Sequence, residues 1–321
     1  MKVTVVAHPI QGLIKYHGLR RLKERIPYHD SISVCVQALT TTTTVETLEE
    51  RRESRFIVNG KTVYGQDKDR IEVVLGKLST LAEFHGGFRV VSENSLKTGK
   101  GLGFSASGFA ALGLSASRAL GLSLDAVSLS EIVRLGAGSS TRSLAGRFAI
   151  WYADKKGRSY AEQIKCPEDI DISMVIVPIH SELKTDEAHA EVLSSPLFKA
   201  RCRNIGAMLE KMKKAIVKGD TVTIGRLAEE DTLNLHAITM TGKSRMLLWE
   251  PDTIRVIREL IKKRNDGVQA WYSMDTGPSV FINTYKENSR TIAKCLREIG
   301  LKNIVVSEIG ESPIFVSNHL F

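Results

Sequence analysis

A glycine- and serine-rich stretch, GKGLGFSASG at residues 99–108, has the composition of a loop that binds phosphate. Such a loop exposes backbone N–H groups, and the positive end of a following helix favours an anion. Its candidate phosphate-binding residues are Gly103, Ser105 and Ser107, with Phe104 among them as a residue foreign to such a site. The spacing differs from the GxxxxGKS/T pattern of a Walker loop, which excludes an ordinary P-loop NTPase. By composition alone, a loop without a ligand fits equally well.

A second hydroxyl-rich turn, GAGSSTRS at residues 136–143, places Ser139 and Ser140 close to Arg142. Arginine binds carboxylate or phosphate through two parallel hydrogen bonds. The pattern therefore indicates an anion site, and the alternative is a helix end that carries a surface arginine.

Three more residues, in two further motifs, could act on a bound anion. Lys15 and Tyr16 follow an apolar strand in LIKYHG, and Asp275 lies between a strand and a Gly-Pro turn in MDTGPS. Taken singly, Lys15 also fits an exposed strand edge, and Asp275 fits an aspartate that bonds to its own turn.

Strands and helices mix along the chain, which predicts an α+β fold of two units, residues 1–168 and 169–321. The small-residue pattern at 105–121 predicts a helix that packs closely on a sheet, and Asn59-Gly60 predicts a hairpin turn. The second unit begins after Cys166-Pro167 with a buried strand at 172–179. It includes a helix over 251–267, which we expect Asp252 to cap.

The composition of the 321 residues narrows the function classes. No apolar run approaches the length of a membrane span and the N-terminus does not resemble a signal peptide, so a cytoplasmic protein without membrane contact is expected. The net charge of +9 suits anionic metabolites or a solvated surface, whereas short basic stretches and 6% aromatic residues argue against nucleic-acid binding. The four cysteines lack the spacing of a zinc site, so no metal site is predicted and we expect them to be reduced.

Six motifs, in order along the chain, resemble those of the GHMP kinase superfamily and within it the diphosphomevalonate decarboxylases. LIKYHG is similar to xIKYWGK, YHDSISV to PxNxSLSxT, and GLGFSASGFAAL to GLASSASGFAAL. RLGAGSSTRSLAGRFAIW is similar to RxGSGSASRSLFGGFVxW, SSPLFKAR to TSPLLxxR, and MDTGPSVFI to FDAGPNAxI. The resemblance implies a ribosomal-protein-like N-terminal domain, a ferredoxin-like C-terminal domain and an active site in the cleft between them.

The family's catalytic lysine, arginine and aspartate correspond to Lys15, Arg142 and Asp275. The family phosphorylates the 3-hydroxyl of a mevalonate derivative with ATP, and loss of that phosphate with CO2 then forms an alkene. On this resemblance Arg142 binds the C1 carboxylate, Asp275 places negative charge near C3, and Lys15 supports the leaving phosphate or orients Asp275. Ser105, Ser139 and Ser140 would bind phosphate oxygens, and which serine serves which phosphate stays open.

Departures from the family pattern lie around its phosphates. Phe104 stands in place of the first serine of the phosphate loop, and Lys97 in place of a proline. Four more departures lie at positions that surround the 5-diphosphate in the family. His17 replaces a tryptophan, Leu19 a lysine and Ala137 a serine. His189 replaces an arginine, although the alignment is looser there. These changes fit a substrate with less charge at that end and a poor ATP site.

The departures resemble the mevalonate 3,5-bisphosphate decarboxylases, whose substrate arrives already phosphorylated at O3. The resemblance implies a small phosphorylated mevalonate-derived substrate, no ATP or metal cofactor, and a homodimer. One alternative is a diphosphomevalonate decarboxylase that uses ATP and Mg2+, in which Asp275 accepts the proton of the 3-hydroxyl. A small-molecule kinase that makes mevalonate 3-phosphate is a further alternative.

Overall fold

The computed structural model describes residues 1–50, 53–97, 101–181 and 185–321. A sheet of six strands forms the N-terminal part, in the order β16-β1-β6-β9-β7-β8. All of its pairs are antiparallel except β7 with β9. Its strands are β1 (Lys2–Ala7), β6 (Thr41–Glu50), β7 (Arg55–Val58), β8 (Lys61–Thr62), β9 (Gly86–Asn94) and β16 (Ile314–Val316). The expected hairpin turn is present between β7 and β8, where Asn59 and Gly60 both have positive φ.

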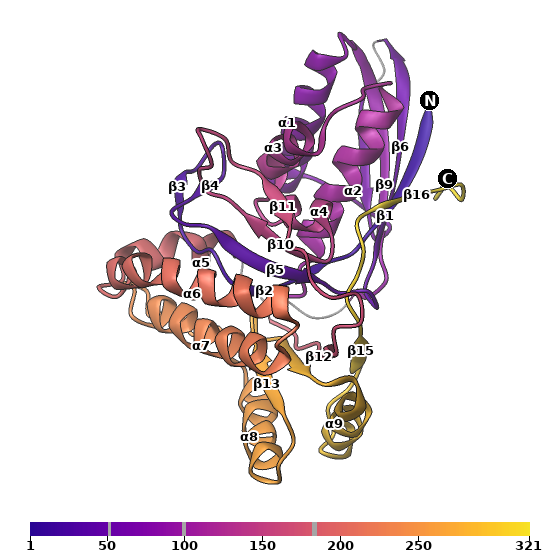
Figure 1. The fold of residues 1–321 in the computed structure, drawn as a ribbon. Helices are drawn as coiled ribbons and strands as arrows, with labels where there is room; N and C mark the ends of the chain where they lie inside the picture. The colour runs from indigo at the N-terminus through magenta and orange to yellow at the C-terminus, as the bar shows by residue number, and fades with distance from the viewer. Residues whose placement is uncertain (51–52, 98–100, 182–184) are drawn as a thin grey trace.

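Helices cover one face of this sheet (Figure 1). They are α1 (Gly65–Leu81), α2 (Phe104–Ala119), α3 (Ala126–Gly136) and the short α4 (Ser140–Ala145). Ten small or apolar residues of α2 are buried, and Gly113 has no room for a Cβ because Val133 of α3 would lie 2.2 Å from it. The small residues therefore allow α2 to pack closely against both the sheet and α3, as expected.

A second sheet of the N-terminal part contains the strand that leads to Lys15. It has the order β11-β10-β5-β2, with β2 (Ile10–Ile14), β5 (Ser31–Cys35), β10 (Phe148–Trp151) and β11 (Ala161–Gln163). All five residues of β2 and of β5 are buried. A small ribbon of β3 (Leu19–Arg21) and β4 (Ile26–Pro27) connects β2 to β5.

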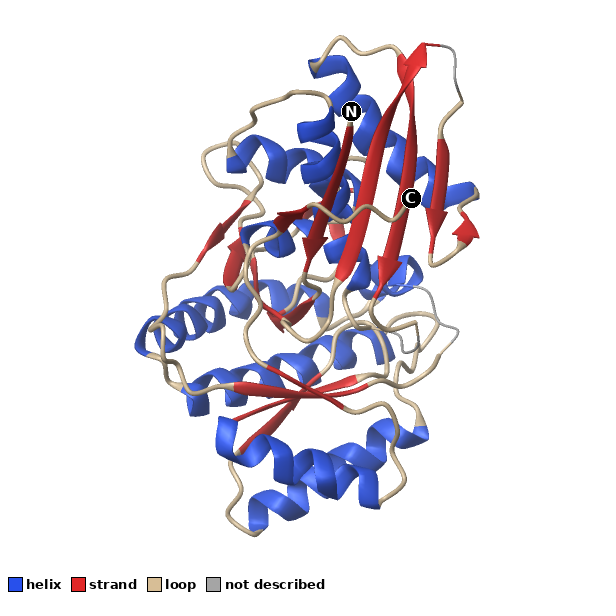
Figure 2. Cartoon of the chain, turned by 90° about the vertical axis from the view of Figure 1, so that its right-hand side faces the viewer, coloured by secondary structure: helices blue, strands red, loops and turns tan. Residues whose placement is uncertain are grey.

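The C-terminal part is an antiparallel sheet between two layers of helices (Figure 2). Its strands follow the order β13-β14-β12-β15, with β12 (Ser173–Val177), β13 (Ala270–Ser273), β14 (Val280–Thr284) and β15 (Val305–Ser307). The helices are α5 (Thr185–Glu191), α6 (Phe198–Lys218), α7 (Thr221–Met240), α8 (Pro251–Asn265) and α9 (Lys286–Glu298), with a 3-10 turn at Val192–Ser194. The prediction that Asp252 caps α8 is wrong: Glu250 is the N-cap, its N–H donates to Thr253 Oγ1, and Asp252 pairs with Arg255.

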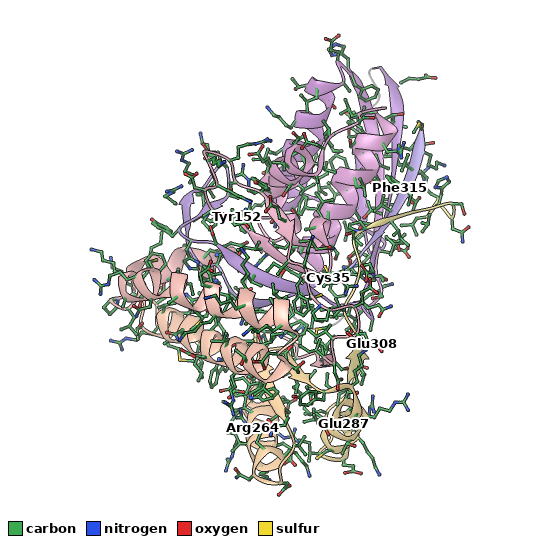
Figure 3. All side chains as sticks on the ribbon, viewed as in Figure 1. Cys35, Tyr152, Arg264, Glu287, Glu308 and Phe315 are labelled. Carbon is green, nitrogen blue, oxygen red and sulfur yellow. The ribbon has the colours of Figure 1, made fainter. Side chains whose placement is uncertain are left out.

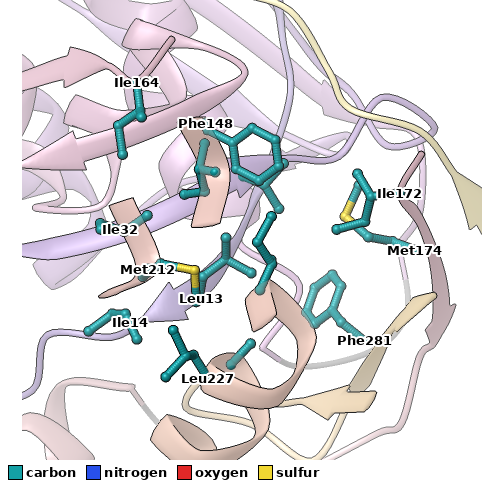
Figure 4. Packing of buried hydrophobic residues seen from close by; sticks show 14 of the residues in the cluster. Leu13, Ile14, Ile32, Phe148, Ile164, Ile172, Met174, Met212, Leu227 and Phe281 are labelled. Atoms are coloured by element: carbon teal, nitrogen blue, oxygen red, sulfur yellow. The ribbon is translucent and has the colours of Figure 1, made fainter. Parts of the chain in front are cut away.

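One hydrophobic core joins the two parts (Figure 4). Leu13 and Phe148 of the second sheet pack with Met212 of α6, Leu227 of α7 and Phe281 of the C-terminal sheet. Helices α6 and α7 thus lie between the two sheets and fix the end of β2 relative to β13. This packing sets the geometry of the residues that follow those strands.

The end of the chain returns to the N-terminal part. Val36 forms a bridge with Ile309, β16 pairs with β1, and His319 Nδ1 lies 2.7 Å from Thr4 Oγ1. Figure 3 labels Glu308 and Phe315 on this returning segment. Residues 309–321 therefore pack with the first unit, although they follow the second along the chain. No helix among the described residues is long and apolar enough to cross a membrane.

Candidate active site

A cavity of about 780 Å3 lies where loops from both parts of the chain meet. Its inner wall is formed by the residues after β2, the start of α2, the turn before α4 and the residues after β13. The predicted site residues that line it are Lys15, Tyr16, Gly103, Phe104, Ser105, Ser139, Arg142 and Asp275. The structure thus brings together residues that are up to 260 positions apart in the sequence.

Lys15 lies at the end of β2 with its side chain buried. Its Nζ donates to Thr232 Oγ1 and Ser273 Oγ, each at 3.0 Å, and lies 3.6 Å from Asp231 Oδ2. Burial lowers the pKa of Lys15, and the nearby carboxylates of Asp231 and Asp275 oppose that change. The ammonium is therefore held at the cavity wall by two hydroxyls and a carboxylate, rather than exposed at a strand edge.

Asp275 follows β13 and reaches across to β2, where Gly12 N–H donates to Oδ1 at 3.1 Å and to Oδ2 at 3.3 Å. Burial raises the pKa of Asp275, while Lys15, the Gly12 N–H and Arg142 favour its charged form. Asp275 therefore bonds to β2 rather than to its own turn. Because it bonds to β2, its carboxylate connects the C-terminal sheet to the strand that carries Lys15.

Arg142 of α4 is buried, and its Nε and Nη1 have no hydrogen-bond partner in the part of the chain that the structure describes. Its guanidinium carbon lies 5.5 Å from the ring centre of Tyr16 and 6.0 Å from that of Trp151. Burial lowers the pKa of Arg142, whereas Tyr16 and Asp275 favour its charge. A buried guanidinium with unused donors at a cavity wall is suited to bind an anionic ligand.

Phe104 is the first residue of α2, directly after the N-cap Gly103, whose φ is +74°. Gly103 must be glycine because a Cβ would lie 2.5 Å from the carbonyl oxygen of Ile10. Phe104 and Leu96 are half-buried against the central core and both line the cavity. The start of α2 therefore has an apolar wall beside the exposed Ser105. Gly99 and Lys100 of the same stretch lie outside the described residues.

Three of the predicted serines differ in placement. Ser139 lines the cavity, whereas the hydroxyl of Ser107 lies 2.6 Å from Thr41 Oγ1 and donates to the carbonyl of Phe104. The hydroxyl of Ser140 is buried at 2.6 Å from the carbonyl of Ala137. Ser107 and Ser140 thus bond within the protein, and Ser105 and Ser139 are the serines that the structure places at the cavity.

Asp231 was not among the residues singled out from the sequence. It is fully buried in α7, accepts from the Lys15 backbone N–H at 2.9 Å and from Arg201 Nη2 at 2.7 Å, and holds Lys15 Nζ. The same Arg201 nitrogen donates to the Lys15 carbonyl. The sequence analysis did not predict helix α7. Asp231 and Thr232 lie on its buried apolar face, and this polar pair within an apolar face is the signal that could have revealed them. The apolar residues of that face include Ile224, Leu227, Ala228 and Leu235.

Three positions that differ from the family pattern, His17, His189 and Ala137, also line the cavity, and the two histidine rings are in contact. The outer part of the cavity extends along β7, β9 and α1 and is lined by Asn59, Tyr64, Gln66, Asp67, Arg70 and Asn94.

Two family models match the chain. The diphosphomevalonate decarboxylase-like N-terminal domain covers residues 7–161, and the mevalonate 5-diphosphate decarboxylase C-terminal domain covers residues 184–315. Among curated proteins, phosphomevalonate decarboxylase of Haloferax volcanii is 39% identical over 309 residues, 95% of each chain. Diphosphomevalonate decarboxylase of Saccharomyces cerevisiae is 28% identical over 302 residues, 86% of this chain and 76% of the yeast protein.

Solved structures show the same fold. The mevalonate diphosphate decarboxylase of Staphylococcus aureus superimposes with a TM-score of 0.91 at 26% identity over 98% of each chain. That of Enterococcus faecalis, described for ATP binding mediated by mevalonate diphosphate, also has a TM-score of 0.91 at 26% identity, over 99% of each chain.

Proposed function

Because the chain belongs to the diphosphomevalonate decarboxylase family of carboxy-lyases, we propose that its substrate is mevalonate 3,5-bisphosphate and that it acts without ATP. The products are isopentenyl phosphate, CO2 and inorganic phosphate. The observation that carries this proposal is the apolar wall of Phe104 and Leu96 at the start of α2, the place where a family member would hold the phosphates of a nucleotide.

The proposed reaction balances without an added reactant. The C3–O bond breaks and its electron pair leaves with the phosphate, while the C1–C2 bond breaks and its pair forms the C2=C3 double bond. CO2 is released from C1, and no proton or electron has to be supplied. The protein needs to position the substrate and to stabilise charge on the leaving phosphate and at C3.

The residues at the cavity fit these tasks. The unused donors of Arg142 bind the C1 carboxylate, and the carboxylate of Asp275 stabilises positive charge at C3. Lys15 Nζ, which bonds to Thr232 and Ser273 and lies beside Asp231, places a positive charge at the cavity wall that supports the leaving phosphate. Ser105 and the start of α2 supply further donors for that phosphate.

A nucleotide triphosphate fits this loop poorly. Its several negative charges require hydrogen-bond donors, and Phe104 and Leu96 offer none where α2 begins. The Haloferax relative, a phosphomevalonate decarboxylase by name, supports a single phosphate at the O5 end of the substrate.

A specific observation favours a second candidate, the ATP- and Mg2+-dependent decarboxylation of diphosphomevalonate to isopentenyl diphosphate. The outer part of the cavity, from Asn59 to Arg70, is open space that the small bisphosphate does not require. The Enterococcus neighbour is described as binding ATP. This candidate predicts that ATP-Mg2+ raises the melting temperature of the protein at micromolar concentration.

The proposal includes a cytoplasmic homodimer, as the family resemblance implies, and no resident metal ion. Light scattering of the purified protein tests the dimer.

Incubation with mevalonate 3,5-bisphosphate in nucleotide-free buffer tests the proposed reaction. The expected result is CO2 and isopentenyl phosphate. Turnover of diphosphomevalonate that depends on ATP, with none of the bisphosphate, would favour the second candidate instead.

A further inference from the structure

Two histidine rings in contact with each other line the cavity beside Tyr16. The ring centres of His17 and His189 are 4.4 Å apart, and the ring of Tyr16 stacks on His189 at 5.1 Å. His17 is 1% exposed and His189 is 8% exposed, yet both line the cavity. The guanidinium of Arg142 also lies over the ring of Tyr16.

The hydrogen bonding of His17 defines what its ring can bind. Its Nδ1 lies 3.2 Å from the carbonyl oxygen of Tyr16, and because a carbonyl only accepts, Nδ1 carries the proton. Its buried Nε2 has no partner among the residues that the structure describes. In a neutral ring Nε2 is therefore a hydrogen-bond acceptor without a donor.

The surroundings of His17 keep its ring neutral. Burial lowers the pKa of His17 well below its ordinary value, and the neighbouring His189 of α5, Arg201 of α6 and His236 of α7 act in the same direction. Two further titratable residues line the same cavity: Tyr16, which directly precedes His17 in the chain, and Arg25. A group that brings a proton to Nε2, or enough negative charge to hold one there, would satisfy the ring.

A phosphate monoester is such a group, because its second ionisation lies near pH 6 and it exchanges one proton in the neutral range. The proposed substrate has three anionic groups. Arg142 takes the carboxylate and Ser105 with the start of α2 takes the leaving phosphate, so the O5 phosphate remains. Two carbons separate it from C3, which lets it reach another part of the lining, and the histidine pair beside Tyr16 is the part without an assigned role.

We infer that His17, with His189 packed on it, is the specificity-determining group for the O5 phosphate monoester, and that binding takes up one proton from solvent, shared between Nε2 and a phosphate oxygen. This inference rests on the proposed function for the placement of the substrate. A neutral His17 ring that accepts a single proton gains one positive charge, which suits the monoester better than the more highly charged diphosphate.

Calorimetric titration with mevalonate 5-phosphate, without nucleotide, tests the inference. This probe has the O5 phosphate but no leaving group at C3, so it binds without reacting. At pH 7.5, titrations in two phosphate-free buffers of different ionisation enthalpy should give close to one proton taken up per ligand bound. The affinity should fall up to about tenfold per pH unit between pH 7.5 and 9, and mevalonate 5-diphosphate should bind at least tenfold more weakly.

Two variants identify the group. His17→Gln should lose the proton uptake and at least tenfold in affinity, whereas His85→Gln, at an exposed histidine, should match the wild type. Uptake that persists in His17→Gln would overturn the inference, as would wild-type binding without uptake or no binding of the probe. The wild-type titrations decide this even if His17→Gln does not fold. Turnover without nucleotide is measured separately, so failure of either proposal can be recognised independently.

Discussion

The side chains of Asp275 and Lys15 both pack against the backbone of Gly12. A Cβ on residue 12 would lie 2.6 Å from Asp275 Oδ1 and 2.7 Å from Lys15 Cγ, so both side chains occupy the space that a glycine leaves empty. The Gly12 N–H also donates to the Asp275 carboxylate. The relative position of the carboxylate and the lysine thus depends on a missing methyl group in the middle of β2.

Gly12→Ala should therefore lower kcat by about 100-fold, because it displaces both side chains by a large part of an ångström. Gly76→Ala is the matched control, since nothing lies within 4 Å of a Cβ at this exposed position of α1. It should keep full activity and stabilise the protein by about 0.5–1 kcal/mol. Steady-state kinetics gives kcat of both variants, and denaturant unfolding gives their stability. A Gly12→Ala enzyme with wild-type kcat would contradict the close packing of Asp275 and Lys15 on Gly12.

Asp231→Asn should destabilise the fold by about 3–5 kcal/mol, because it leaves the buried cations of Lys15 and Arg201 without their shared carboxylate. Asp69→Asn, at an exposed aspartate of α1, should change the free energy of unfolding by less than about 0.5 kcal/mol. Urea denaturation of the two variants gives the comparison. Equal stabilities would show that Asp231 does not hold the two cations together.

Arg142→Met should abolish activity and raise the free energy of unfolding. The buried guanidinium has unused donors, so its removal relieves a desolvation cost, which is the behaviour of a residue kept for its ligand. Thermal unfolding and an activity assay on the same sample test both parts. A destabilised variant would indicate that Arg142 has a structural role instead.

The stability of the fold should fall as the pH drops below about 6.5. Burial lowers the pKa of His29 to about 4 and that of His236 to about 3, and it lowers the pKa of His17 well below its ordinary value. The unfolded chain binds these protons near pH 6.5, whereas the folded chain does not, so each histidine costs up to about 1.4 kcal/mol per pH unit. Urea unfolding at pH 7.5, 6.5 and 5.5 measures the slope, and His29→Gln should reduce it. A stability that stays constant over this range would contradict the burial of neutral histidines.

The sequence was informative where a residue type is unusual for its local pattern. Arg142 among serines and Asp275 before a Gly-Pro turn stand out, and the structure brings both to one cavity with Lys15. The small residues of α2 likewise predicted a closely packed helix, because few other elements need them.

The partners of these residues depended on tertiary packing, which a linear pattern does not contain. Asp231 touches Lys15 across 216 positions because α7 lies between two sheets, and the hydroxyl of Ser107 bonds to Thr41 of a strand 66 positions away. For Asp231 and Ser107 a long-range contact thus decided the role of a polar side chain. At the start of α8 the deciding feature is local, because Pro251 occupies the first helical position and makes Glu250 rather than Asp252 the N-cap.

The most direct measurement of the central claim is the stoichiometry of the reaction of mevalonate 3,5-bisphosphate in the presence of an enzymatic trap that consumes any ATP. The account predicts one CO2, one inorganic phosphate and one isopentenyl phosphate per substrate, at a rate that the trap and added EDTA leave unchanged. No CO2 from the bisphosphate under these conditions, beside CO2 from diphosphomevalonate once ATP and Mg2+ are supplied, would contradict it.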